Sequence, residues 1–459
     1  MKLLKRQRFE ALVGYSRRPY AFASSQEVAW FASEGEVLLA TILIDLSDDE
    51  LVVIILGRDL DRRFRCIDVI TGHTKPWAAE KAMKAKCAAT LKAGKTVFPQ
   101  GDERGKKLDL FGPLPTKKQK KIGEHFIKVR DLAGYSSAKE IIEEMMHHYR
   151  DIDGNFIEQF QTTGFDSRLW ELYTFAYLIE ERMILDRSHH APDFLATNGA
   201  QEIAIEAVIV QPTDTDKKEV YKFDELTPQD ILRLQRHYMP IKFGSPLFTK
   251  LKKRYWEMAH VAGKPLVFAI ADFHQDQSML WSSTALANYL YGSYHEFHHD
   301  EDGQLIISPI RIEFHEHNGK KIPSGFFFTP EAENVSAILF SASGTISKFI
   351  RMGKVAGFGD DTVKIIYQGA KHRFDPNASM PDPFFFEVNE EYDETWGHGV
   401  NVFHNPKALI PLHPSVFPSA THHRLIGDGQ ISSELAEFHP YTSTTVMLVP
   451  DKKTGHPSA

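Results

Sequence analysis

Short β-rich runs alternate with turn residues along the chain between residues 26 and 74. The runs EVAWFAS, EVLLATILIDL, LVVIILGRDL and RFRCIDVI are rich in β-branched and aromatic residues, and turn residues separate them. This spacing predicts an antiparallel meander of about four strands. The run KPWAAEKAMKAKCAATLKAG follows and predicts a helix, with Gly94 as its candidate C-cap.

The period changes in the run FDSRLWELYTFAYLIEERMIL, which begins at Phe165. Its apolar residues recur at three- and four-residue spacing, which predicts a helix that has Asp166 or Ser167 as its N-cap. Glu171 lies at the edge of the apolar stripe. Asp193 follows Pro192, and the proline together with the next apolar residues predicts an extended segment.

The run EIAIEAVIV has the period of a strand and carries a third acid, Glu206. The period of two places Glu202, Ala204, Glu206 and Val208 on one face. An unpaired charge among isoleucine, alanine and valine would be costly. We therefore expect a partner such as a cation for Glu206.

The remaining pattern predicts an α/β core and a β-rich end. Thr227 and Pro228 mark the start of the helix TPQDILRLQRHY. A second helix is expected around Lys250 to Trp256, a buried strand in KPLVFAIADF, and a third helix that ends at Gly292. Beyond Asp300 short aromatic runs predict strands and a long irregular tail. They are LIISPIRIEFHEH, SGFFFT, VSAILFSASG, VKIIYQG and FFFEV.

A chain of 459 residues is too long for one ordinary core. The expected fold class is a multidomain α/β (α+β) protein. We expect an N-terminal α+β domain at 1–98, a linker and helical segment (including SAKEIIEEMMHHY) at 99–155, a core at 156–300 and a β-rich C-terminal region at 301–459. Within the linker, residues 99–121 are polar and predict a loop.

Composition restricts the class of partner and the compartment. The net charge is −7, so nucleic-acid binding would need a local basic patch. Cys66 and Cys87 form no CxxC motif, which favours a reducing compartment. No secretory signal and no long apolar run is found in the sequence. These features predict a cytoplasmic protein that has no membrane partner.

A helix and two extended segments thus supply three carboxylates, Glu171, Asp193 and Glu206, and hard oxygen ligands of this kind suit Mg²⁺ or Mn²⁺. A helix Glu, then Pro-Asp, then a strand Glu resembles the PD-(D/E)xK (restriction-endonuclease-like) nuclease superfamily over about residues 166–271. The resemblance implies an αβββαβ core and metal-dependent hydrolysis of DNA or RNA. The phrases FDSRLWELY, PDF, EAV, KFIRMG and FHNPKALIPL also resemble a large uncharacterised bacterial family, which brings no established function.

The chain departs from the superfamily pattern at Val208, where a lysine usually steadies the attacking water. Some members carry the basic residue on the next helix, and here Lys250 could lean toward the sheet edge. The other interpretation is that the run KLKKR is a solvated face. Glu171 could likewise be an ion-pair partner of Arg168, and Pro-Asp could be a turn.

Three function classes remain open at this stage. The leading one is a metal-dependent nuclease-like phosphodiesterase in which Glu171, Asp193 and Glu206 hold Mg²⁺ or Mn²⁺ and Lys250 stabilises charge. The alternative is a decayed nuclease fold that binds nucleic acid or protein without catalysis. The third is a histidine-zinc hydrolase, which requires two histidine pairs to converge, from His295, His298 and His299 and from His315 and His317.

Two further motifs have weaker patterns. His404 and the pair His422-His423 are expected in loops or as partly buried polar residues. Lys348 and Arg351, in SASGTISKFIRMG, could present donors to a phosphate, although the glycine pattern of a P-loop is absent.

Overall fold

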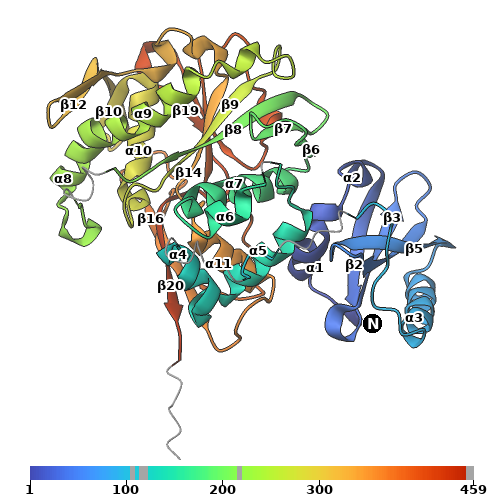
Figure 1. Cartoon of the computed structure of the whole chain (residues 1–459). Helices are drawn as coiled ribbons and strands as arrows, with labels where there is room; N and C mark the ends of the chain where they lie inside the picture. The colour runs from blue at the N-terminus through green and yellow to red at the C-terminus, as the bar shows by residue number, and fades with distance from the viewer. Residues whose placement is uncertain (104–108, 113–121, 153, 214–219, 451–459) are drawn as a thin grey trace, which may run out of the picture. The chain divides into compact units, whose positions relative to one another are not determined.

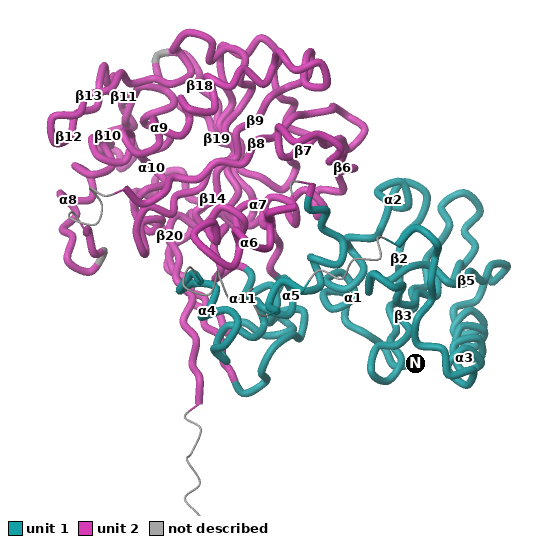
Figure 2. The backbone as a smooth tube through the Cα atoms, viewed as in Figure 1, with its two compact units in different colours: residues 1–151, 349–362, 388–393 teal, residues 152–348, 363–387, 394–459 magenta. Residues whose placement is uncertain are grey.

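The computed structural model describes residues 1–103, 109–112, 122–152, 154–213 and 220–450. It is an α+β multidomain protein, as predicted, with an antiparallel N-terminal sheet and a separate mixed sheet. Contacts divide the chain into two compact units (Figure 2). Unit 1 contains residues 1–151, 349–362 and 388–393, and unit 2 contains residues 152–348, 363–387 and 394–459. The predicted boundaries at residues 98, 155 and 300 stay predictions.

Unit 1 contains the predicted meander. Its antiparallel sheet has the order β1-β2-β3-β4-β5, and α3 (Pro76–Lys92) buries Ala79, Met83 and Cys87 against its core. Gly94 follows the helix in the left-handed conformation (φ +70°) that a helix-ending glycine adopts. The strands are β1 (Lys2–Leu3), β2 (Ser25–Ala32), β3 (Leu38–Asp45), β4 (Leu51–Arg58) and β5 (Phe64–His73).

Helices complete unit 1. The predicted helix SAKEIIEEMMHHY is α5 (Ser136–His148), which buries Ile141, Ile142, Met145 and Met146 at helical spacing. The other helices are α1 (Arg6–Val13), α2 (Tyr20–Ser24), α4 (Glu124–Asp131) and the part of α11 (Ile346–Val355) from residue 349 on. Most of the predicted linker at 99–121 lies outside the described residues.

Unit 2 is built on an eight-stranded sheet of order β19-β18-β17-β14-β9-β8-β7-β6. β7 runs antiparallel to both of its neighbours, β6 and β8, whereas β8, β9 and β14 run parallel. From α7 to β9 the main elements follow the expected αβββαβ order: α7 (Phe165–Glu180), β6 (Ile184–Asp186), β7 (Phe194–Thr197), β8 (Glu202–Val210), α9 (Met239–Leu251) and β9 (Leu266–Asp272).

Helices cover both faces of this sheet, which explains why all seven residues of β9 are buried (Figure 1). On one face, α9 and α10 (Met279–Tyr291) share a core with Val208, Phe268 and Ile270. On the other side, Trp170 of α7 donates its indole N–H to the carbonyl of Ala269 at 2.8 Å. A Cβ at Gly344 would lie 2.5 Å from the Trp170 ring, so only glycine fits there.

Helix ends around the candidate site differ in part from the predictions. Neither Asp166 nor Ser167 is an N-cap, because α7 already begins at Phe165 and Gly164 precedes it without a side-chain cap. The capping box of Thr227 and Asp230 does begin α8 (Pro228–Arg233), as predicted. The helix expected around Lys250 to Trp256 instead ends at Leu251, because Arg254 adopts a left-handed conformation (φ +49°).

The end of the chain is β-rich, as predicted, and part of it extends the sheet of unit 2. β14 (Ala337–Ser341), β17 (Val400–His404), β18 (Thr421–Leu425) and β19 (Ile431–Glu434) belong to that sheet. The run SGFFFT is not a strand, because the left-handed Gly325 (φ +80°) leads into a 3-10 turn that buries Phe326 and Phe327.

The remaining elements of unit 2 form hairpins, a small sheet and one short helix. They are α6 (Phe156–Phe160), β10 (Ser293–His299) with β11 (Leu305–Arg311), β12 (Phe314–His317) with β13 (Lys320–Pro323), and the sheet of β15 (Lys364–Lys371), β16 (Asp382–Val388) and β20 (Pro440–Leu448). Within the described parts of the chain, no helix is both long and apolar enough to cross a membrane.

Candidate functional site

Glu206 lies in the middle of β8 and is 6% exposed. Its neighbours on the same face, Ala204 and Val208, are buried against α9, so the carboxylate has an apolar setting, as the period of the strand predicts. Val208 is a core residue that is 3% exposed, and a lysine at this position would meet the helix packing. The cation for Glu206 therefore has to come from another element.

Lys250 supplies this cation from the last turn of α9. Its Nζ lies 2.5 Å from Glu206 Oε1, and its side chain is 27% exposed, whereas Lys252 and Lys253 are exposed. The expectation that Lys250 leans toward the sheet is confirmed, and the solvated-face interpretation is wrong for this residue. Helical spacing explains the difference, because Leu247 and Leu251 face the core and Lys250 lies beside them.

Tyr255 is a second donor to Glu206 that sequence reasoning missed. Its hydroxyl donates to the same Oε1 at 2.7 Å, and its ring is 2% exposed. Burial, followed by the charge of Glu206, raises the pKa of Tyr255. The hydroxyl therefore remains a donor and fixes the orientation of the carboxylate, while Glu206 Oε2 has no hydrogen-bond partner among the described residues.

Asp193 lies in the bend immediately before β7, next to the middle of β8. One of its oxygens, Oδ2, accepts the backbone N–H of Ala207 at 2.7 Å, so the side chain points to the residue that follows Glu206. The pKa of Asp193 is raised well above its usual range, first by burial and then by the charges of Glu206 and Glu171. The hydrogen bond from Ala207 and the charge of Lys250 oppose this rise.

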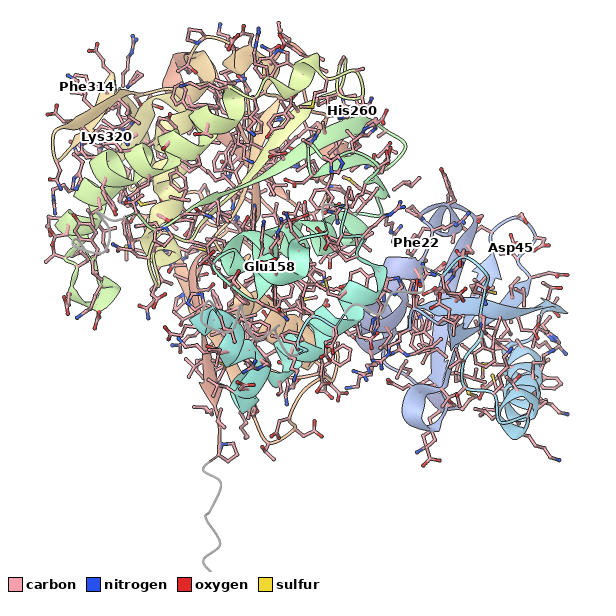
Figure 3. The ribbon with its side chains drawn as sticks, in the orientation of Figure 1. Phe22, Asp45, Glu158, His260, Phe314 and Lys320 are labelled. Atoms are coloured by element: carbon pink, nitrogen blue, oxygen red, sulfur yellow. The ribbon has the colours of Figure 1, made fainter. Side chains whose placement is uncertain are left out.

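A pair of histidines supports the loop that carries Asp193. His260 (labelled in Figure 3) donates from Nε2 to the carbonyl of Ala191 at 2.7 Å. Its ring stacks on that of His189, with the ring centroids 3.8 Å apart and the planes parallel within 1°. This hydrogen bond and the ring stack hold the bend before β7, and Asp193 therefore does not lie on a remote surface turn.

Glu171 is buried on α7 and is fully engaged by arginines. Its Oε2 accepts from Arg168 at 2.6 Å and its Oε1 accepts from Arg187 at 2.9 Å. The ion pair with Arg168, which the sequence left open, therefore exists, although it is buried rather than on the surface. Arg187 follows the last residue of β6. Its pairing with Glu171 could not have been predicted from local spacing. The charge of Glu171 reaches Asp193, where it contributes to the raised pKa.

The three acids thus gather in one region, but they are not equivalent. Oδ1 of Asp193 and Oε2 of Glu206 have no hydrogen-bond partner within the described ranges, whereas both oxygens of Glu171 accept from arginines. Two oxygens of adjacent carboxylates therefore remain available to a hard cation, and a cation would relieve the repulsion that raises the pKa of Asp193.

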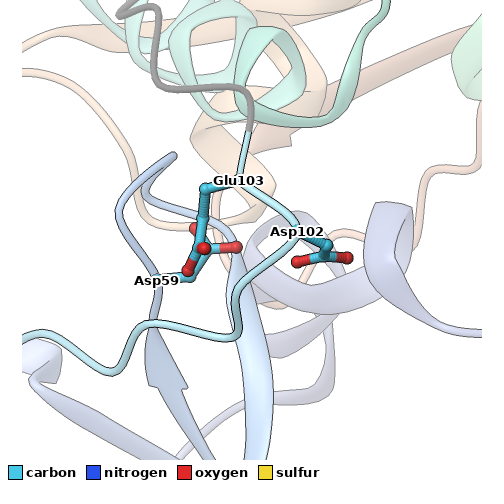
Figure 4. Close-up of side chains that lie close together, drawn as sticks. All are labelled: Asp59, Asp102 and Glu103. Carbon is cyan, nitrogen blue, oxygen red and sulfur yellow. The ribbon is translucent and has the colours of Figure 1, made fainter.

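A different group of three acids brings its ligand atoms close together in the described part of the chain. Asp59, Asp102 and Glu103 of unit 1 each offer an oxygen within 4.8 Å of the other two (Figure 4). Glu171, Asp193 and Glu206, which are also described, form no such group. Arg65 pairs with both Asp59 and Asp102, and Glu103 accepts backbone N–H groups. These contacts give each of the three acids a partner within the fold.

The histidines form no metal group among the described residues. His295, His298 and His299 lie on β10, and His315 and His317 lie on β12. His315 is fully buried, and its two nitrogens contact the Arg236 carbonyl and the Ser324 hydroxyl. His422 and His423 lie on β18 and His404 ends β17, so the loop alternative was wrong for them. The other alternative, a partly buried polar residue, is confirmed for His404 and His423.

Lys348 and Arg351 are also buried, so they present no donors to a phosphate. Lys348 is fully buried and pairs with Glu394 at 2.7 Å, and Arg351 is 2% exposed. The sequence showed correct helical spacing but could not show that this face of α11 turns inward.

Comparisons with protein-family models, with curated proteins and with solved structures found no match for this chain. The resemblance to the PD-(D/E)xK superfamily stays a prediction.

Proposed function

We propose that the chain is a metal-dependent nuclease-like phosphodiesterase acting on DNA or RNA, with Mg²⁺ or Mn²⁺ held by Asp193 and Glu206. The observation that supports this most is the contact of Lys250 with Glu206 next to Asp193, in an αβββαβ order of elements. A carboxylate pair that has free oxygens and an adjacent ammonium is the set of groups that phosphodiester hydrolysis needs.

Each side chain has a distinct part in this proposal. The metal, when bound, polarises the phosphodiester and activates water. Asp193 and Glu206 bind it through their free oxygens, and Tyr255 orients Glu206. Lys250 stabilises developing negative charge, which replaces the lysine usual at Val208. Glu171 orients Arg168 and Arg187 rather than binding metal directly.

A decayed, non-catalytic module is the second candidate, and one observation favours it. Lys250 and Tyr255 already satisfy Glu206 Oε1, and arginines satisfy Glu171, so the acids have partners without any metal. Such a protein would bind nucleic acid without cleaving it. The affinity would be independent of the metal and would fall with salt concentration.

Cleavage of a substrate panel separates the two candidates. The full chain is incubated with labelled single- and double-stranded DNA and RNA, with Mg²⁺, with Mn²⁺ and with a chelator. The proposal expects cleavage that requires the metal. Binding without cleavage on the whole panel would support the decayed module, and absence of both would contradict both candidates.

Lys250→Met is expected to lower the cleavage rate by about 10²- to 10³-fold, because a preorganised charge donor is lost from the site. Lys253→Met is the matched control, since Lys253 lies three residues further on and is exposed. Rates are measured at saturating Mn²⁺. Equal rates for the two variants would contradict a role for Lys250 in charge stabilisation.

Asp193→Asn tests the metal site without a substrate. Burial and nearby acids raise the pKa of Asp193, so its contribution to wild-type stability is present at low pH and is lost as pH rises through the raised pKa. The metal-free variant is therefore expected to be more stable than wild type at pH 8 and to depend less on pH.

With Mn²⁺ bound, wild type should become more stable than Asp193→Asn. A saturating concentration of about 100 Kd is expected to stabilise wild type by about 2.7 kcal/mol and Asp193→Asn much less, as measured by thermal unfolding. The wild-type response should grow from pH 6 to pH 8, because the metal competes with a proton. Glu202→Gln, on the exposed end of the same strand face, serves as control and should respond like wild type. An equal Mn²⁺ response in Asp193→Asn would rule out this site.

A further inference from the structure

A cavity of about 220 Å³ lies in unit 2 where β14 begins and where β17 and β18 end. Pro406, Pro411, Leu412 and Leu425 form its apolar walls. A cavity of about 150 Å³ in another protein takes up benzene, so this space suits one ring system somewhat larger than benzene. The walls and the size favour a flat, mainly apolar ligand.

Two polar residues of the lining are already engaged by the fold. Ser336 Oγ donates to the Ile410 carbonyl at 2.6 Å and accepts from Leu266 N at 3.1 Å. Asn405 donates to two backbone carbonyls and accepts from Lys407 N at 2.9 Å. The polar recognition of a ligand therefore falls to the other two polar side chains of the cavity.

His404 presents a hydrogen-bond acceptor. His422 must donate from Nε2 to the Phe417 carbonyl (3.0 Å), because a carbonyl cannot donate, and its Nδ1 then accepts from His404 Nε2 at 2.9 Å. This leaves a lone pair on Nδ1 of the neutral His404 ring. Burial, then the charges of His422 and Arg424, lower the pKa of His404 to about 3, so the ring stays neutral.

Arg424 presents a hydrogen-bond donor, and its charge is paired. Its Nη1 donates to Glu434 Oε1 at 2.7 Å, which balances the guanidinium. Its Nε and Nη2 have no hydrogen-bond partner within the described part of the chain. An acceptor and a donor thus belong to the lining of one small cavity. Its charged lining residue, Arg424, is already paired with Glu434, which favours a polar but uncharged ligand over a phosphate or a carboxylate.

We propose that this cavity binds an uncharged planar heterocycle of the nucleobase type. Each base carries an N–H donor next to an oxygen or ring-nitrogen acceptor along one edge, which complements His404 Nδ1 and the Arg424 guanidinium. The base could come from a free nucleoside or from a single-stranded end. The inference does not depend on the nuclease proposal, because it uses no residue of the carboxylate site.

Saturation-transfer NMR on the full chain tests the proposal with adenosine, guanosine, cytidine and uridine, and with short single-stranded oligonucleotides. At least one nucleoside should bind with a Kd of about 0.1 to 1 mM, the range expected for a ligand of this size. Tighter binding of the oligonucleotide would identify a strand as the source, and equal or weaker binding would identify the free nucleoside.

Two variants locate the binding. Arg424→Met and His404→Phe should each weaken it at least about tenfold, because each removes one hydrogen bond to the ligand. Arg373→Met removes an arginine that has only exposed, 3.8 Å ion pairs and should bind like wild type. Thermal unfolding verifies that the variants are folded. The proposal would be overturned if no nucleoside bound at concentrations well above the expected Kd. Equal binding by Arg424→Met and Arg373→Met would also overturn it.

Discussion

Glu206→Gln is expected to abolish metal-dependent cleavage while the protein remains folded. The variant keeps an oxygen for the Tyr255 hydroxyl, which lies 2.7 Å from Oε1, but it removes the charge that pairs with Lys250 and that would bind a metal. A loss of about 4 kcal/mol of charge stabilisation corresponds to about a thousandfold slower reaction. The measurement is the initial cleavage rate at saturating Mn²⁺.

The choice of glutamine follows from the contacts of Glu206. Alanine would leave the buried hydroxyl of Tyr255 without an acceptor, at a cost of about 1–3 kcal/mol, and a loss of activity could then reflect a loss of folding. Glu202→Gln on the same strand is the control for charge removal, because Glu202 is exposed and its nearest cation, Lys264, is 3.6 Å away. Equal cleavage by wild type and Glu206→Gln would assign the activity to another site or to a contaminant.

The sequence was sufficient where the arrangement depends on local periodicity. The period of two in β8 placed Glu206 on the α9 face, and the buried run of β9 predicted a strand inside a parallel or mixed sheet. Helical spacing brought Lys250 toward this face. These positions follow from the geometry of a strand or helix alone, so one sequence is enough to predict them.

Contacts between distant segments could not be predicted in this way. Arg187 reaches Glu171 from 16 residues away across a hairpin arm, and Tyr255 reaches Glu206 only because the left-handed Arg254 turns the chain after α9. Neither contact has a periodic signal. Arg168 is different, because it lies three residues before Glu171 on the same helix. Local helix geometry is enough to predict that these two side chains pair.

The number of strands in the sheet of unit 2 could not be predicted from the sequence either. β14 pairs with β9 in parallel although about 65 residues separate them, and β17 and β18 extend the same sheet further. A parallel pairing of this kind leaves no turn signal between its strands, because the connection passes through helices and hairpins. The apolar content of these strands predicted only that they were strands.

Lys348→Met is expected to cause the largest loss of stability, of about 3–5 kcal/mol. Lys348 is fully buried, and Glu394, its partner at 2.7 Å, is 1% exposed, so the variant leaves a carboxylate without its cation in the interior. The charge of Lys348 also lowers the pKa of the nearby Glu180, which burial raises to about 7. Removal of the lysine therefore affects two acids at once.

Thermal unfolding with three variants tests this expectation. Lys348→Met should lower the Tm by on the order of 10 °C, at about 2–4 °C for each kcal/mol. Lys364→Met is the control, because Lys364 of the wild type has only an exposed ion pair of 3.8 Å with Glu387. This variant should change the Tm by no more than about 1–2 °C. The double variant Lys348→Met/Glu394→Gln should regain part of the loss, because it removes the unpaired charge. A Tm for Lys348→Met that matches that of Lys364→Met would show that the Lys348–Glu394 pair contributes no more than a surface pair.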